Sequence, residues 1–243
     1  MHRIPRLWHP VRAPQATTVR KGGRFVSDRA PPSRGPRLPG RGAPAIWLAL
    51  ALALLLAACG RPPELPRLGP GDVVLAFGDS LTYGTGAGPD EGYPAVLARL
   101  IGRTVVRSGV PGETSAEGRR RLPAVLEAHR PRLVVLCTGG NDFLRKAPRA
   151  ETEGNLRAML DAARKHGVAV VLVGVPAPGL FASPPGFYEA LAEEYGLPYE
   201  GRVLKQVLYD NGLKSDPIHP NALGYRRIAE ALAALLREAG VVP

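Results

Sequence analysis

The chain has 243 residues, of which 45% are hydrophobic and 22% charged, enough for one globular domain with a sizeable core plus a tail. Its formal net charge of +11 would suit a polyanion-binding protein, but ten of its 32 Lys and Arg residues lie in residues 1–42, beside a single acid, Asp28. Because the remaining 22 basic residues are matched by 20 acidic ones, we expect no nucleic-acid partner for the folded part.

Residues 1–42 are rich in Pro, Gly and Arg and show no periodic apolar pattern, which indicates a disordered basic leader. The alternative that this stretch is not translated stays open, with a start at Val26 or Leu38. Residues 43–58 contain a run of 14 almost purely apolar residues, Ala45–Ala58. That length is too short to span a bilayer comfortably but typical of a signal-peptide hydrophobic region.

The apolar run ends in Leu-Ala-Ala-Cys-Gly at residues 56–60, which resembles a bacterial lipobox. We therefore expect export, cleavage before Cys59 and lipidation of its thiol, which would anchor the protein to a membrane surface on the periplasmic or extracellular face. Ordinary signal cleavage, giving a periplasmic or secreted protein, is the alternative. Residues 59–71 hold four prolines and predict a short extended tether.

Residues 72–240 alternate short apolar runs with amphipathic segments. The predicted strands are Val73–Phe77, Thr104–Arg107, Leu133–Thr138, Val168–Val173 and Leu197–Tyr199. Helices are predicted over Tyr93–Ile101, Glu151–His166, Pro185–Tyr195 and Leu204–Leu208. Another helix, capped by Thr114 and Glu117, runs toward His129, with Pro123 breaking or kinking it. A last helix is capped by Asn221 and ends at Glu238. Strands alternating with helices indicate a parallel sheet of about five strands, with helices on both faces.

Four polar clusters lie where such a sheet would gather them. Gly78-Asp79-Ser80 follows the first strand through a loop, Pro111–Ser115 follows the second, and Gly139–Asp142 forms a tight turn after the third. The fourth cluster, Asp216–Pro220, directly precedes the last helix. Ligands of parallel sheets bind beyond the carboxyl ends of the strands, so we expect these clusters to meet there.

Together the clusters supply the groups that acyl transfer requires. Ser80 offers a hydroxyl nucleophile, His219 a base to take its proton, and Asp216 a carboxylate to orient the imidazole. Each cluster alone also fits a plain structural role as a turn or a helix cap. His129 and His166 lie near predicted helix C-termini, where a cation is mildly favoured, and we interpret them as structural.

The remaining cysteine and histidine residues indicate no second site. Cys137 lies inside an apolar strand and is interpreted as an inert core residue. No cluster of His and Cys has the spacing of a metal site, so no metal is expected.

The four clusters, in this order, resemble the four sequence blocks of the SGNH/GDSL hydrolase family, with Ser80, Gly112, Asn141 and His219 at the block positions. Within that family the chain is similar to the bacterial thioesterase, lysophospholipase and arylesterase subgroup. The resemblance implies a flavodoxin-like three-layer α/β/α sandwich and no cofactor. It also implies an oxyanion hole formed by the backbone N–H groups of Ser80 and Gly112 and the side chain of Asn141.

We therefore expect a monomeric serine ester hydrolase that acts on small-molecule or lipid esters with short-to-medium acyl chains. The alternatives are a carbohydrate O-acetylesterase and a non-catalytic binding lipoprotein. Once the elements are assigned, no long lid insertion remains, so an open groove is expected. Its predicted rim is Phe143–Pro148 and Val175–Gly186, with Leu144, Leu180, Phe181 and Phe187 as the apolar candidates.

Overall fold

The computed structural model describes residues 65–179 and 183–243. The predictions for residues 1–42 and 43–58, and the lipidation of Cys59, lie outside the described residues. The described part of the tether is not helical, and it already packs on the domain. Leu68 is buried, and its N–H donates a 2.9 Å hydrogen bond to the carbonyl of Val241.

The described residues form a five-stranded, fully parallel sheet in the order β2-β1-β3-β4-β5. This confirms the predicted fold class, and it places β1 and β3 side by side, with Gly78 paired to Cys137 at their carboxyl ends. The strands are β1 (Val73–Gly78), β2 (Thr104–Gly109), β3 (Leu133–Cys137), β4 (Ala169–Val173) and β5 (Tyr199–Glu200).

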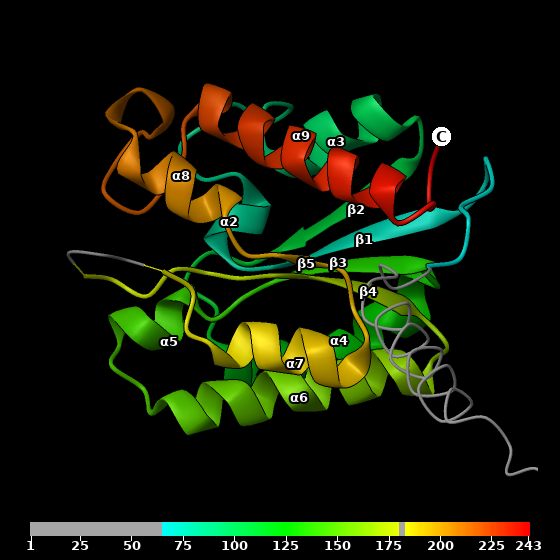
Figure 1. Cartoon of the computed structure of the whole chain (residues 1–243), viewed down its shortest axis with the longest axis horizontal. Helices are drawn as coiled ribbons and strands as arrows, with labels where there is room; N and C mark the ends of the chain where they lie inside the picture. The colour runs from blue at the N-terminus through cyan, green and yellow to red at the C-terminus, as the bar shows by residue number, and fades with distance from the viewer. Residues whose placement is uncertain (1–64, 180–182) are drawn as a thin grey trace, which may run out of the picture. The chain divides into compact units, whose positions relative to one another are not determined.

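Helices cover both faces of the sheet, as Figure 1 shows. One layer contains α2 (Ser80–Tyr83), α3 (Tyr93–Ile101), α8 (Val203–Tyr209) and α9 (Ala222–Glu238); the other contains α4 (Ser115–His129), α5 (Gly140–Leu144), α6 (Arg149–Lys165) and α7 (Phe187–Tyr195). A 3₁₀ turn, η1 (Asn211–Leu213), follows α8. Within these layers α3 packs against α9 and α4 against α6.

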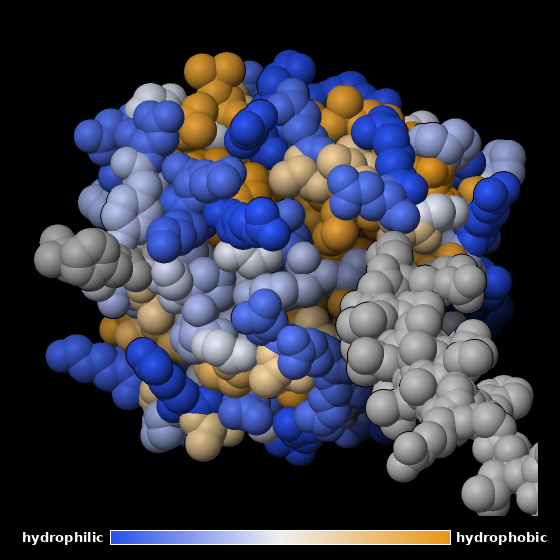
Figure 2. Space-filling view, in the orientation of Figure 1, coloured by the Kyte–Doolittle hydropathy of each residue, from blue (hydrophilic) through white to orange (hydrophobic). Residues whose placement is uncertain are grey.

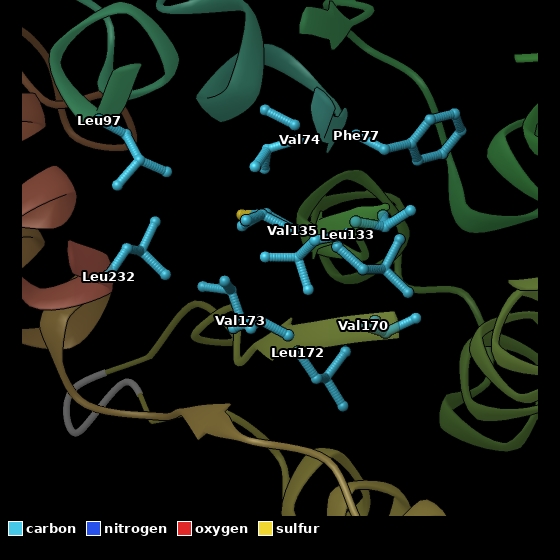
Figure 3. Close-up of a cluster of buried hydrophobic side chains, with 14 of the residues drawn as sticks. Val74, Phe77, Leu97, Leu133, Val135, Val170, Leu172, Val173 and Leu232 are labelled. Carbon is cyan, nitrogen blue, oxygen red and sulfur yellow. The ribbon is translucent and has the colours of Figure 1, made fainter. Parts of the chain in front are cut away.

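The core lies between the central strands and the two helical layers. In Figure 3, Leu97 of α3 and Leu232 of α9 approach the sheet on the side of Val74, Val135 and Val173. Strands β1 and β3 are buried almost throughout, as expected for central strands covered on both faces. On the face drawn in Figure 2, hydrophilic residues predominate and apolar ones form small separate patches.

One predicted feature of local structure is wrong and another is narrowed. Ser80 does not lie in a loop: it opens the one-turn helix α2, whose N-cap is Asp79. Of the two effects predicted for Pro123, breaking or kinking its helix, the break is absent, because α4 runs without interruption from Ser115 to His129. A proline inside a helix removes one backbone hydrogen bond, and packing of α4 against α6 and β1 compensates for that loss.

The capping box of Thr114 and Glu117 is present as predicted. Other helices and strands begin or end a few residues from their predicted bounds. The Gly139–Asp142 segment is not a plain turn, since Gly140 begins helix α5. Strand β5 begins at Tyr199, where the predicted strand ended, because β4 pairs with Tyr199 and Glu200.

Candidate active site

Ser80, His219 and Asp216 form a continuous hydrogen-bonded chain at the carboxyl edge of the sheet. The Oγ atom of Ser80 lies 3.0 Å from Nε2 of His219, although the two residues are 139 positions apart. Nδ1 of His219 lies 2.7 Å from Oδ2 of Asp216. Both ring nitrogens of the histidine are thus engaged, one by a hydroxyl and the other by a carboxylate.

The turn that carries the base is held by the aspartate itself. Oδ1 of Asp216 accepts hydrogen bonds from the backbone N–H groups of Ile218 and His219, at 2.8 and 2.9 Å. This leaves Oδ2 for the imidazole. Burial by itself would raise the pKa of Asp216, but the hydrogen bonds from His219 and Ile218 outweigh it and lower the pKa below its usual value.

Helix α2 presents Ser80 because it packs directly against the ends of β1 and β2. A Cβ at Gly109 of β2 would lie 2.2 Å from the N atom of Tyr83, and one at Gly78 of β1 would lie 2.6 Å from Oγ1 of Thr82. Glycine at these two positions lets α2 approach both strands closely. Close packing therefore holds Ser80 at the carboxyl edge of the sheet.

The three residues expected to form an oxyanion hole line one groove. They are Ser80, Gly112 and Asn141, of which the first two carry backbone N–H groups and the third a side-chain amide. Gly112 has a φ of 80°, a left-handed conformation that favours glycine. Nδ2 of Asn141 donates to the carbonyl oxygen of Glu113 at 3.0 Å, which uses one of its two N–H bonds and leaves the other.

A buried polar network ties α5, which carries Asn141, to the start of α4. The carboxylate of Asp142 accepts hydrogen bonds from the N–H of Ser115 at 2.8 Å and from its Oγ at 2.5 Å. Asn155 of α6 donates to the same Oγ at 3.0 Å. Asp142 is buried, so these bonds also satisfy a charge that would otherwise be costly.

Asp79, the residue before the nucleophile candidate, lies fully inside the protein. Its Oδ1 caps α2 by accepting from the N–H of Leu81 at 3.0 Å. Among the described residues, Oδ2 has no hydrogen-bond partner. Burial, together with the nearby carboxylates of Glu113 and Asp142, raises the pKa of Asp79 to about 7. The carboxyl therefore titrates near neutral pH.

The site opens into a groove with a volume of about 640 Å³. Besides the residues above, its walls come from Leu144 of α5, from 175–179 after β4, and from the segment 217–219. Leu144 is a rim residue as predicted, whereas Phe187 stacks on Tyr188 at 4.6 Å between ring centroids and does not line the groove. The predicted rim residues Leu180 and Phe181 lie outside the described residues.

Sequence reasoning missed one wall of the groove and gave no role to three charged residues beside it. Leu208 and Tyr209 of α8 line the groove, together with Lys205 and Lys214. Asp79 and Glu113 belong to the predicted clusters, but no role was predicted for their buried carboxyl groups, and the partly buried Arg121 was not identified. Helical spacing offered a signal for Arg121, since it lies three residues after the buried Gly118 and next to the buried Leu122.

The residues interpreted as structural lie where the sequence indicates. His129 is in the last turn of α4, and His166 follows α6, where its Nδ1 lies 2.8 Å from the carbonyl oxygen of Ala162. Cys137 is buried in β3. Residues 65–179 and 183–243 contain no group of three or more His, Cys, Asp or Glu arranged to hold a metal ion. In the same residues, no helix is both long and apolar enough to cross a membrane.

Comparison with known proteins connects this geometry to a family. The chain is 35% identical over 149 residues to Esterase TesA of Pseudomonas aeruginosa, which covers 59% of the chain and 73% of that relative. It is 31% identical over 179 residues to the Thioesterase 1/protease 1/lysophospholipase L1 of Escherichia coli K12, covering 70% of the chain and 86% of the relative. An Arylesterase of Vibrio mimicus is 27% identical over 197 residues, with 76% and 94% covered.

Solved structures agree with the sequence relatives. The crystal structure of TesA has a TM-score of 0.63 at 30% identity, and the match covers 69% of this chain and 99% of that one. The crystal structure of AlinE4, an SGNH-hydrolase family esterase, has a TM-score of 0.56 at 32% identity, covering 71% and 98%. The family model described as GDSL-like Lipase/Acylhydrolase matches residues 76–227. The chain therefore belongs to the GDSL-like lipase/acylhydrolase family and is a carboxylic-ester hydrolase.

Proposed function

We propose that Ser80 is the nucleophile of this hydrolase, that His219 is its general base and acid, and that Asp216 orients the imidazole. The observation that carries the proposal is the chain of contacts from Ser80 Oγ to His219 Nε2 at 3.0 Å and from His219 Nδ1 to Asp216 at 2.7 Å. A serine hydroxyl is a weak nucleophile at neutral pH, so it needs a base at this distance.

In the first half-reaction, Ser80 Oγ attacks the ester carbonyl carbon while His219 Nε2 takes the hydroxyl proton. The resulting tetrahedral intermediate collapses: the carbon–oxygen bond to the alcohol breaks, and His219 gives its proton to the departing oxygen. This leaves an acyl group on Ser80. Water then repeats the sequence, with His219 as base, and releases the carboxylic acid.

The negative charge of each tetrahedral intermediate needs hydrogen-bond donors that are already in place. We assign this role to the N–H groups of Ser80 and Gly112 and to Nδ2 of Asn141. The Asn141 amide has one N–H bond fixed by the carbonyl of Glu113, which restrains the orientation of the other. A donor held in this way needs no reorganisation as charge develops.

The groove supports a substrate with an acyl chain of short-to-medium length. Its walls include the apolar side chains of Leu144, Val175, Leu208 and Ile218, and Leu144 and Ile218 are also solvent-exposed. Each methylene buried there stabilises the complex by about 0.8 kcal/mol until the groove ends. The described residues of one chain suffice to build the groove, which supports activity as a monomer.

The other two functions considered from the sequence are less well supported. A binding lipoprotein has no need of a serine, a histidine and an aspartate in hydrogen-bonded sequence. A carbohydrate O-acetylesterase would need little apolar wall for its acyl group, whereas this groove has several apolar residues. Three relatives named above carry esterase, thioesterase and arylesterase names.

Reaction with a fluorophosphonate probe tests the proposal. The probe phosphonylates a serine that a base activates, so we expect one adduct per chain, located by peptide mass mapping at Ser80. His219→Ala should leave the probe unreacted, and Ser183→Ala, at an exposed serine, should still label at Ser80. Labelling at another serine would contradict the assignment.

From its sequence alone, we further propose that the protein is exported and held at a membrane surface by lipid on Cys59. The support is the lipobox-like Leu-Ala-Ala-Cys-Gly after a 14-residue apolar run. Such an anchor would place the groove beside a source of lipid esters.

A further inference from the structure

Arg121 and Glu113 form a partly buried ion pair next to the proposed oxyanion donors. Nε of Arg121 donates to Oε1 of Glu113 at 2.7 Å, and Nη2 donates to Oε2 at 2.8 Å, a bidentate arrangement. The Glu113 side chain is 5% exposed and the Arg121 side chain 25%. The guanidinium also lies over the ring of Phe77, 4.1 Å from its centroid. The bidentate contact gives the pair a defined geometry.

The same guanidinium holds the ends of two strands. Its Nη1 donates to Oγ of Ser108 at 2.6 Å, and its Nη2 lies 3.1 Å from the carbonyl oxygen of Ser108, near the end of β2. Nη2 also approaches the carbonyl oxygen of Gly78, the last residue of β1, at 3.5 Å. Arg121 thus links β1, β2 and the segment that contains Glu113.

Each proposed oxyanion donor is close in sequence, or hydrogen-bonded, to a residue of the Arg121–Glu113 pair or to a backbone group that Arg121 contacts. Ser80 is two residues after Gly78, and Gly112 directly precedes Glu113. Asn141 is bonded to the carbonyl oxygen of Glu113 at 3.0 Å, although it lies on a different helix. The pair therefore contacts, directly or through one peptide unit, all three segments that supply donors.

We propose that the Arg121–Glu113 pair is a positioning device that sets the spacing of the oxyanion donors, and this inference rests on the proposed function of Ser80, Gly112 and Asn141. Neither side chain lines the groove, so the pair acts through the backbone it holds. Oxyanion stabilisation depends on donor distance within a few tenths of an ångström. A loosened Glu113 segment would shift Gly112 and Asn141 together.

Kinetics of Glu113→Gln and Arg121→Lys test the inference. Gln keeps the shape of the side chain but loses the charge, and Lys keeps the charge but loses the two-pronged fork. We expect either change to lower kcat about 10- to 100-fold and to leave KM within about threefold, because only the transition state carries the oxyanion. Breaking a buried pair also destabilises the fold, so thermal midpoints are measured alongside.

Two further variants separate positioning from general loss of stability. Glu113→Gln combined with Arg121→Met removes both charges and leaves no unpaired ion, so the fold is retained while the link is lost. Arg157→Met is the matched control: Arg157 of α6 pairs with Glu153 of the same helix and with Glu194 of α7, and it does not line the groove. The control should keep the parent kcat. The double variant should show the reduced one at a near-parent thermal midpoint.

A double-mutant cycle with Asn141→Ala gives the decisive readout. If the pair positions the Asn141 amide, Asn141→Ala should lower kcat less once the pair is broken. We expect a fall of about 10²–10³-fold in the parent background, but under tenfold in the Glu113→Gln background. Parent kcat in the pair variants, or additive effects in the cycle, would overturn the inference while leaving the proposed function intact. An Asn141→Ala or Ser80→Ala protein with parent activity would instead overturn the proposed function.

Discussion

The Oη atom of Tyr225 donates a 2.8 Å hydrogen bond to the carbonyl oxygen of Thr85 and so joins the helix after His219 to the loop after Ser80. Tyr225 is completely buried in the first turns of α9. In the same contact, a Cβ at Gly86 would lie 2.6 Å from the carbonyl oxygen of Pro220. Two segments 140 residues apart are thus held in register, and the distance between His219 and Ser80 depends on that register.

Removing this hydrogen bond should therefore affect both stability and turnover. Tyr225→Phe leaves the buried ring in place but the Thr85 carbonyl unsatisfied, which costs about 1–2 kcal/mol of unfolding free energy. We also expect a modest fall in kcat, because Ser80 and His219 lose one of their constraints. Urea unfolding and ester kinetics check this. An unchanged unfolding midpoint would show that the Tyr225–Thr85 hydrogen bond does not stabilise the fold.

Asp216→Asn should lower kcat less than Ser80→Ala or His219→Ala does. The difference between the losses should be roughly one to two orders of magnitude. The amide keeps the size of the carboxylate but cannot stabilise an imidazolium, and it offers the wrong hydrogen-bonding group to Nδ1. Asp210→Asn, a change at an aspartate that caps η1 outside the site, is the matched control. Equal rates for parent and Asp216→Asn would remove Asp216 from the mechanism.

Asn141→Ala should lower kcat by roughly 10²–10³-fold and leave KM nearly unchanged. In the proposed mechanism, the Asn141 amide donates to an oxyanion whose charge develops only in the transition state. Steady-state kinetics on one soluble ester separate the two constants. An effect confined to KM would mean that the amide binds the ground state of the substrate.

Asp79 should make the stability of the protein depend on pH between about 4 and 7. Burial raises the pKa of Asp79 from 3.8 to about 7, so the native state binds a proton that the unfolded chain releases. The free energy of unfolding therefore falls as pH rises across this interval and levels off above pH 7. Asp79→Asn cannot ionise, and its stability relative to the parent should grow from pH 4 to 7.

Chemical unfolding of both proteins at several pH values measures this difference. Asp90→Asn, at an exposed aspartate, serves as the control and should follow the parent. Parallel pH profiles for parent and Asp79→Asn would show that Asp79 is ionised in the native state at acid pH, against the effect of its burial.

Much of this architecture followed from the sequence because its signals are local. Apolar runs such as Val73–Phe77 and Leu133–Thr138 predicted central strands, and Thr114 with Glu117 predicted a helix start that the structure contains. The order of the clusters predicted which residues gather at the sheet edge. Ser80, Gly112, Asn141 and His219 do lie along one groove.

What failed depended on contacts distant in sequence. The position of α2 depends on its close packing against Gly78 of β1 and Gly109 of β2, which no local pattern reveals. The uninterrupted α4 across Pro123 depends on packing against α6. The α8 wall of the groove was missed for the same reason, since the position of Leu208 beside the site is set by the tertiary fold.

Cys59 should be the first residue of the mature protein when the full gene is expressed in a bacterium. We expect the protein to partition into detergent and its N-terminal peptide to carry a diacylglyceryl mass. Cys59→Ala should be released or misprocessed, whereas Cys137→Ala should partition like the parent. A mature N-terminus at another residue, without added mass on Cys59, would count against the anchor.

Acyl-chain preference should peak within the groove. On p-nitrophenyl esters from acetyl to palmitoyl, we expect the highest kcat/KM at roughly four to ten carbons, because each added methylene gains about 0.8 kcal/mol only while it is buried. A steady rise to palmitoyl, or activity restricted to acetylated sugars, would refute this preference and leave the catalytic residues untouched.

Turnover of a p-nitrophenyl ester by Ser80→Ala tests the central claim most directly. The substitution removes the hydroxyl that lies 3.0 Å from His219 and changes nothing else in the groove. We predict that kcat falls by on the order of 10⁴-fold or more, with a thermal midpoint close to that of the parent. A folded Ser80→Ala protein that hydrolyses the ester at the parent rate would contradict the assignment of Ser80 as nucleophile.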